Sequence, residues 1–160
     1  MKQRKVTINL AWANVFALLL FAFVTLTSSA AWYVLWGTPS FKDFGGSLLK
    51  DVNPLGAAML VLIMLVSGIV AHEFIHGITW ACFAKRGFRS IRFGVMWGML
   101  TPYCHCKEPL TIRHYRLGAL TPLIILGILP LLLAYPLRSV PLLLWGILFV
   151  TSAGGDILIV

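Results

Sequence analysis

Four long apolar runs constrain the fold of this 160-residue chain more than any other feature. They cover roughly residues 10–36, 54–84, 117–135 and 140–160. A transmembrane helix needs about 20 mostly apolar residues, and each run reaches about that length. We therefore predict an all-α integral membrane protein of about four transmembrane helices, with residues 1–160 forming a single membrane-embedded domain.

Composition and charge support this prediction. Hydrophobic residues make up 59% of the chain and charged residues 11%, whereas soluble domains contain about 45–50% and 25%. The first run exceeds the about 7–15 residues of a signal-peptide core, so we expect it to remain as a helix. Basic residues give a net charge of +8, but they flank the apolar runs and form no long polar tract. Nucleic acid is therefore not an expected partner.

The connection between the second and third runs is strongly basic and sets the predicted topology. Its charged residues are Lys85, Arg86, Arg89, Arg92, Lys107, Arg113 and Arg116, with the single acid Glu108. Basic loops remain in the cytoplasm, so we place this connection there and expect both termini to be cytoplasmic. β-branched and aromatic residues surround Gly94 and Gly98 within it. This pattern predicts a short β-hairpin, or alternatively an irregular interfacial loop.

The heptapeptide AHEFIHG, residues 71–77, places two histidines and an acid inside the second run. On a helix, His72 and His76 lie about 40° apart around the axis and about 6 Å apart along it, so both can bind one ion. Glu73 lies about 100° around from His72 and can act as a base beside the metal. This is the H-E-x-x-H arrangement of zinc hydrolases, which predicts His72 and His76 as metal ligands and Glu73 as catalytic.

Two other interpretations of the heptapeptide stay open. The polar side chains could bond to one another and to helix carbonyls as a packing device, or they could form a proton or ion relay. Metal binding is favoured because structural zinc sites release about 10–16 kcal/mol, which exceeds the about 2.5–3.5 kcal/mol cost of an acid at the helix centre. The pattern also arises by chance in only on the order of one in a thousand sequences of this composition.

A catalytic zinc needs a third protein ligand, and Asp156 is our candidate. Measured from the outer ends of the second and fourth runs, His72 lies about 27 Å deep and Asp156 about 23 Å deep. Gly154 and Gly155 would permit a close approach of helices or a local loosening of the chain. A capping or tail acid is the alternative role for Asp156.

The connecting loop holds further candidates. Cys104, His105, Cys106 and Glu108 lie close together in sequence, but alternation on a strand would point His105 away from the two cysteines. We expect the cysteines to be ordinary hairpin residues, with a second metal site or a thiol that masks the zinc as alternatives. Cys82 points away from His76 on the helix, and we expect it in the core.

Four segments together resemble a known family: AHEFIHG, TPYCHCKEPL, YRLGALTPLIILGILP and GGDILI. They are similar to a family of small bacterial membrane proteins described as zincin peptidases, and the arrangement also resembles the site-2 protease class of intramembrane metalloproteases. The resemblance implies a zinc cofactor held by His72, His76 and Asp156, Glu73 as the base, and location in a bacterial cell membrane. In site-2 proteases a glycine usually follows the aspartate, whereas here Gly155 precedes it.

The predicted function is zinc-dependent hydrolysis of peptide bonds in membrane-protein or peptide substrates, inside the membrane or at its cytoplasmic edge. A hairpin edge near residues 91–106 could hold the substrate extended by strand addition. Two alternatives remain: a non-enzymatic membrane protein that binds or transports metal ions, and a catalytically inactive relative that binds membrane partners. Glu73 distinguishes the first alternative, because hydrolysis needs this residue and metal binding does not.

Overall fold

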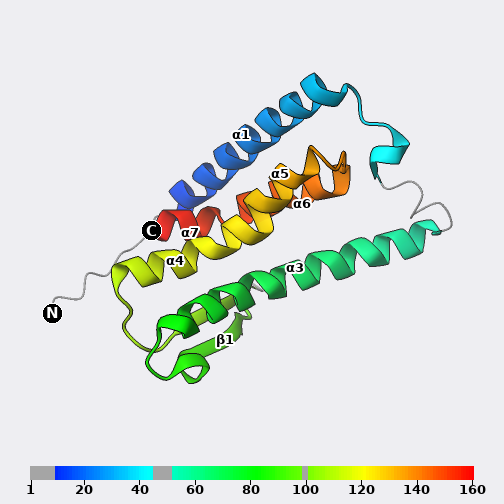
Figure 1. The fold of residues 1–160 in the computed structure, drawn as a ribbon. Helices are drawn as coiled ribbons and strands as arrows, with labels where there is room; N and C mark the ends of the chain where they lie inside the picture. Colours follow the sequence, from blue (N-terminus) through cyan, green and yellow to red (C-terminus); the bar gives the residue numbers. More distant parts are fainter. Residues whose placement is uncertain (1–9, 45–51, 99–100) are drawn as a thin grey trace.

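The computed structural model describes residues 10–44, 52–98 and 101–160. Within them, four helical spans are long and apolar enough to cross a membrane, which confirms the predicted fold class. The spans are Trp12–Trp36, Pro54–Phe83, Ile112–Ala134 and Val140–Ile159. Figure 1 shows the four spans running roughly along one direction, with a hairpin beside one end of the second span. These features indicate a multi-pass membrane protein.

The first span, α1 (Leu10–Trp36), packs against the fourth span. It is followed by the short 3₁₀ helix η1 (Phe41–Phe44). Trp32 of α1 is only 2% exposed and packs in an apolar cluster with residues of the third and fourth spans. This cluster forms one of two cores: Val24, Trp32, Ala134, Val140, Leu143, Ile147 and Val150.

The second span, α3 (Pro54–Phe83), carries the heptapeptide. Asn53 caps its start by accepting a hydrogen bond from the Gly56 backbone N–H at 2.7 Å, and Pro54 suits the first turn, where no N–H is needed. The buried residues of α3 all lie between Gly68 and Ala81. The first half of α3 therefore exposes its apolar side chains, and the second half packs on the rest of the protein.

The third span is divided by its prolines into α4 (Ile112–Pro122), the π-helical turn η3 (Leu123–Ile128) and α5 (Leu129–Ala134). Pro130 has no N–H to donate. Directly before it, the backbone hydrogen bonds change from α-helical to the wider π-helical spacing, as expected where the proline ring must be accommodated. The span begins five residues before the predicted start at residue 117. Hydropathy misses this first turn because its residues are polar.

The fourth span consists of α6 (Val140–Ser152) and the short helix α7 (Gly154–Ile159). The chain turns at Ala153, where ψ is 2°, directly before Gly154 and Gly155. The predicted local loosening of the chain is therefore present. Gly146 of α6 allows close packing on α5, because a Cβ there would lie 2.7 Å from the Leu131 backbone.

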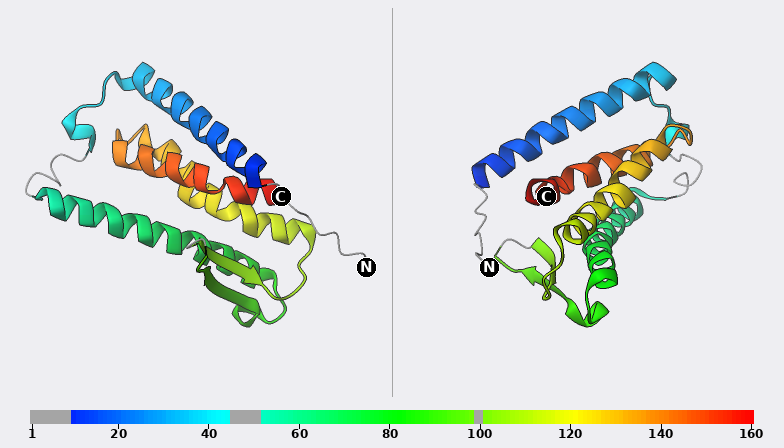
Figure 2. Two further views of the ribbon diagram at one scale, coloured as in Figure 1. Left: turned by 180° about the vertical axis from the view of Figure 1, so that it is seen from behind. Right: turned by 60° about the vertical axis from the view of Figure 1, so that its left-hand side comes forward.

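The connection between α3 and α4 contains the 3₁₀ helix η2 (Gly87–Ser90) and an antiparallel hairpin of β1 (Ile91–Met96) and β2 (Thr101–Cys106). The hairpin prediction is thus confirmed over the irregular loop. The register pairs Ile91 with Cys106 and Met96 with Thr101. Figure 2 shows that the hairpin lies beside the last turns of α3.

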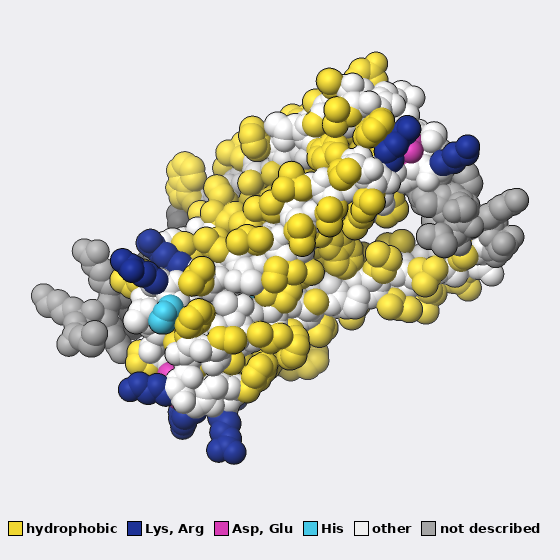
Figure 3. All heavy atoms as spheres, viewed as in Figure 1, with side chains coloured by type: hydrophobic (Ala, Val, Ile, Leu, Met, Phe, Trp, Pro, Cys, Tyr) yellow, Lys and Arg dark blue, Asp and Glu magenta, His cyan; other side chains and the backbone are white. Residues whose placement is uncertain are grey.

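A second core joins the hairpin to the helices. Its buried members are Trp80, Ala81, Ile91 and Ala119, from α3, β1 and α4. On the face shown in Figure 3, apolar side chains spread over the middle of the molecule, while lysines and arginines lie toward its two ends. This distribution is the one expected of a protein whose middle lies in hydrocarbon and whose ends contact lipid headgroups and water.

Candidate metal centre

Two histidines of α3 and one aspartate of α7 come together within two of the candidate membrane spans. The Nε2 atom of His72 lies 3.1 Å from Oδ2 of Asp156, and Nε2 of His76 lies 3.4 Å from Oδ1 of the same carboxylate. Both histidines are buried. One potential ligand atom from each of the three residues lies within 4.8 Å of the others. The group could therefore hold a metal ion.

The break in the fourth span gives Asp156 its place. Asp156 lies in the first turn of α7, three residues after the backbone turns at Ala153. α7 contacts both α1 and α4, so its direction is set by packing on two other spans. Gly154 faces α1 near Leu20 and Phe16. With this packing, the carboxylate points toward His72 and His76 of α3.

The donor set fits zinc. Two atoms bound to one tetrahedral zinc at about 2.0–2.1 Å are about 3.3–3.4 Å apart, close to the two nitrogen–oxygen distances here. Nδ1 of His76 lies 2.8 Å from the carbonyl oxygen of Gly118. A carbonyl can only accept, so Nδ1 carries a proton, and in the neutral ring Nε2 then presents a lone pair to Asp156. Two acceptors at 3.4 Å repel each other unless a proton or metal ion lies between them.

The second histidine is oriented differently. Nδ1 of His72 is buried and has no hydrogen-bond partner among the described residues. Its ring instead lies against the Phe149 ring of α6, with centroids 6.3 Å apart. The His76 ring stacks on Trp80 at 5.2 Å. Both histidines are therefore held by packing and by a contact of Nε2 with Asp156, and His76 has in addition the hydrogen bond from Nδ1 to Gly118.

Glu73 lies beside this group and is not a member of it. The backbone N–H of Cys104 on β2 lies near its carboxylate. Glu73 also lines two neighbouring pockets, of about 430 and 300 Å³, which share Pro102 as a second common residue. The larger pocket also reaches His72, and its other lining residues are mostly apolar: Leu65, Ile69, Thr101, Leu148, Phe149 and Ser152. An acid, two imidazoles and an apolar pocket thus meet at one place.

The loop candidates lie elsewhere. Among the described residues, the three-residue cluster is the one group that could hold a metal ion, and no cysteine belongs to it. Cys104 and Cys106 pack against the second core, while His105 is exposed on the opposite face of β2, as predicted. Burial and the nearby Glu73 charge raise the pKa of the Cys104 thiol to about 12. The cysteines are therefore hairpin residues.

The structure also tests the predictions for Glu108 of the loop and Cys82 of α3. The Glu108 carboxylate accepts hydrogen bonds from the Lys85 backbone N–H, from Arg86 Nε and from Ser90 Oγ. It fixes the hairpin to the end of α3 and is not near the histidines. Cys82, predicted in the core, is exposed; that prediction was wrong, because the last turns of α3 bury only the side facing α4 and the hairpin.

Sequence patterns did not identify two backbone groups at this centre, the Gly118 carbonyl and the Cys104 N–H. Gly118 has a recognisable signal, since it precedes Ala119 in a small-residue pair that favours close helix packing. A side chain at Gly118 would collide with the Trp80 ring. Nothing in the sequence distinguishes the Cys104 N–H from its neighbours.

Comparison with known proteins agrees with the geometry. No curated protein and no solved structure matches the chain. A family model described as "Putative zincin peptidase" matches residues 64–160, which is more than half of the chain and includes α3 from before the heptapeptide, the hairpin and the last two spans. The chain belongs to this zincin peptidase family.

Proposed function

We propose that this protein is a zinc-dependent peptidase that cleaves membrane-protein or peptide substrates inside the membrane or at its cytoplasmic edge. The observation that carries the proposal is the meeting of His72, His76 and Asp156 beside Glu73 and an apolar pocket of about 430 Å³. Family membership supports it. In this proposal His72, His76 and Asp156 hold the zinc, Glu73 is the catalytic base, and the hairpin and both termini are cytoplasmic.

The roles of the side chains follow from their chemistry. Zinc supplies Lewis acidity, which polarises a peptide carbonyl and makes a water molecule more acidic. Glu73 takes a proton from water as the water oxygen bonds to the peptide carbonyl carbon, and it delivers that proton to the leaving amine as the carbon–nitrogen bond breaks. The Cys104 N–H lies near the Glu73 carboxylate, where it can help to orient this group for both transfers. Gly118 orients His76 through its Nδ1 hydrogen.

The free edge of strand β2 supports the proposal that an extended substrate binds there. Pro102 has no N–H, so Val95 and Pro102 form a non-hydrogen-bonded pair of the antiparallel ladder. Alternation then directs the Cys104 N–H to the outer edge of β2, in agreement with its position near Glu73. A substrate strand added at this edge would pass Glu73, with its apolar side chains near the pocket. N-methylation of alternate amides in a substrate peptide should slow cleavage.

The proposal is tested by comparing wild type, Glu73→Gln and Asp43→Asn in zinc-loaded liposomes containing a mixture of apolar membrane-derived peptides. Asp43→Asn is the control, because it changes an acid of η1 at the opposite end of the molecule. New amino termini, identified by mass spectrometry, should form with wild type and Asp43→Asn and not with Glu73→Gln. Zinc content should be equal in all three. Zinc retained by a wild type that produces no new termini would favour a non-enzymatic metal-binding protein, and equal cleavage by Glu73→Gln would exclude Glu73 as the base.

A further inference from the structure

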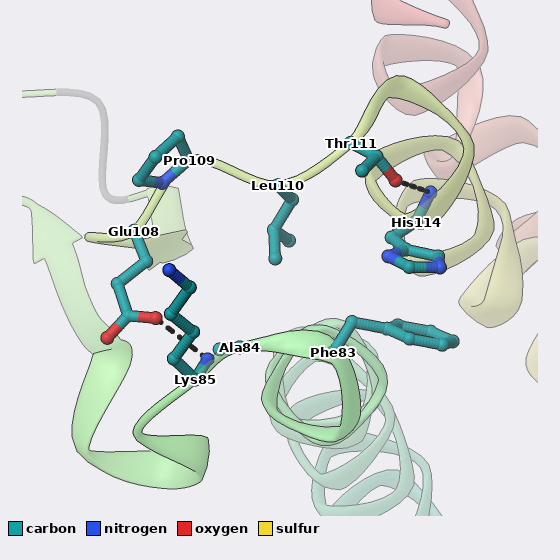
Figure 4. A pocket seen from close by; sticks show the side chains of 8 residues that line it. All are labelled: Phe83, Ala84, Lys85, Glu108, Pro109, Leu110, Thr111 and His114. Atoms are coloured by element: carbon teal, nitrogen blue, oxygen red, sulfur yellow. Dashed lines mark hydrogen bonds between the residues drawn. The ribbon is translucent and has the colours of Figure 1, made fainter.

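A separate cavity of about 370 Å³ lies where α3 ends and the chain approaches α4 (Figure 4). It shares no lining residue with the two pockets beside Glu73. Its lining residues are Phe83, Ala84, Lys85, Glu108, Pro109, Leu110, Thr111 and His114. Its volume is within the range of about 300–1,000 Å³ found for small-ligand sites. The proposed peptidase mechanism makes no use of it.

The charge left available in this cavity is positive. Glu108 is the one acid among its lining residues, and three donors already engage its two oxygens. Lys85 contributes its backbone N–H to that network, while its ammonium forms no ion pair with any described residue. Figure 4 shows the Lys85 side chain extending from the end of α3 toward the segment at Pro109 and Leu110. An anion entering the cavity would therefore meet a cation that has no partner.

The other walls are apolar. Leu110 points into the space between the two segments, and the Phe83 and His114 rings face each other, with centroids 4.1 Å apart and planes within 10° (Figure 4). Phe83 is 39% exposed and Ile112, at the start of α4, is 72% exposed. A ligand that matches this surface has an anionic group near Lys85 and hydrocarbon along the aromatic and aliphatic side chains.

The cavity also lies at the level of lipid headgroups. One candidate span ends at Phe83 and the next begins at Ile112, so the cavity is at the polar boundary of both. Basic side chains gather at this end of the molecule (Figure 3). Basic pockets between membrane helices on the cytoplasmic side are suited to anionic headgroups. A lipid in the same leaflet can reach the cavity without leaving the membrane.

We propose that this cavity binds the phosphate of an anionic phospholipid, with the Lys85 ammonium on the phosphate, the His114 ring beside it, and an acyl chain along Phe83 and Ile112. The bound lipid would link the end of α3 to the start of α4. These two helices also carry His76 and the Gly118 carbonyl. The site is distinct from the proposed zinc centre, so either can exist without the other.

The test measures lipid retention by the purified full chain, using mass spectrometry of protein released from nanodiscs of phosphatidylcholine with a minor fraction of phosphatidylglycerol. Wild type should retain phosphatidylglycerol preferentially. Lys85→Gln should retain about tenfold less, because a charge-assisted contact is lost. Lys107→Gln is the matched control: it removes the same charge from an exposed residue that does not line the cavity. Lys85→Arg should preserve retention and show that position 85 tolerates substitution.

Three results would overturn the proposal. Equal loss in Lys85→Gln and Lys107→Gln would mean that only overall charge attracts the lipid. Equal retention of the two lipids by wild type would mean that no anionic site exists. The third result comes from adding glycerol phosphate to the detergent-solubilised protein, where weak or absent binding is expected. Lys85-dependent binding as tight as that of the lipid would instead identify a site for soluble phosphate esters.

Discussion

His76 donates a hydrogen bond from Nδ1 to the carbonyl oxygen of Gly118, 2.8 Å away, and so directs its Nε2 atom at Asp156. This contact joins α3 to α4 directly at the proposed zinc centre. Hydrogen bonds to metal-ligating histidines fix the tautomer and ring orientation, and their loss typically lowers metal affinity 10–100-fold. A substitution at Gly118, which has no side chain that could bind metal, should therefore change the zinc affinity.

Gly118→Ala should weaken zinc binding by about tenfold. The added methyl group would collide with the Trp80 ring, which stacks on His76, and α4 with its carbonyl must move away. Competition with a zinc-binding dye measures the affinity. Gly155→Ala is the matched control, because a Cβ there meets nothing within 4 Å although the residue precedes Asp156. Equal affinities in the two variants would contradict the role of the Gly118 carbonyl.

Acid should loosen the hairpin through Glu108. Hydrogen bonds from Arg86, Ser90 and the Lys85 N–H lower the pKa of this carboxyl from 4.5 to about 2. A lowered pKa stabilises the folded state above the ordinary value, and that stabilisation is lost as pH falls from about 4.5 to about 2. Thermal unfolding midpoints in detergent should fall over this window.

The matched variant for this prediction is Glu108→Gln, which should have a lower midpoint at neutral pH and a smaller change across the acid window. Asp43, whose pKa is lowered by hydrogen bonds from Ser40, adds its own acid sensitivity at the opposite end of the molecule. Asp43→Asn therefore separates the two contributions. An identical acid response in wild type and Glu108→Gln would show that the Glu108 network does not stabilise the fold.

Cys104 should react slowly with maleimide at pH 8. Only the thiolate is nucleophilic, and burial together with the Glu73 charge raises the pKa of this thiol to about 12. In a chain with Cys82→Ser and Cys106→Ser, the alkylation rate should rise about tenfold per pH unit through pH 10. Glu73→Gln should increase the rate by removing the nearby charge. A rate that reaches a plateau near pH 9 would mean that Cys104 has an ordinary thiol pKa.

Arg138 should be stabilising through its side chain although its backbone is strained. Its φ of 45° is unfavourable for a residue with a Cβ. The guanidinium compensates by lying 3.6 Å from Asp43 and 4.4 Å from the Trp36 ring centroid. Arg138→Ala loses both contacts and keeps the strain, whereas Arg138→Gly loses both and relieves it. Denaturant unfolding should find Arg138→Gly more stable than Arg138→Ala by about 1 kcal/mol. An alanine variant that is as stable as the glycine variant, or more stable, would contradict this.

The spans could be predicted from sequence because membrane helices need long apolar runs, and the structure places them within a few residues of the predicted bounds. The exception is the start of α4 at Ile112. Its first turn, with Arg113, His114 and Arg116, extends past the apolar region, so hydropathy cannot detect it. Ser139 and Pro141 mark the start of α6 clearly, since a capping side chain and an early proline both favour a helix start.

The site was predictable only in part. Spacing alone places His72 and His76 on one face of a helix, and depth along the membrane makes Asp156 a reasonable partner. The approach of the Cys104 N–H to Glu73 depends on how the hairpin packs on α3, which is a tertiary contact without a local pattern. The exposure of Cys82 could not be predicted for a similar reason. Helical periodicity gives the direction of each side chain around the axis, but it does not tell which direction faces lipid.

Zinc content of the detergent-purified protein, measured by elemental analysis, tests the central claim most directly. The account predicts about one zinc per chain in wild type and in Glu108→Gln, and loss of zinc from His72→Ala and Asp156→Ala. Zinc that persists in Asp156→Ala would remove Asp156 from the ligand set. A folded wild type that takes up no metal, even when zinc is supplied, would contradict the account and leave the His72, His76 and Asp156 group as a packing or proton-relay device.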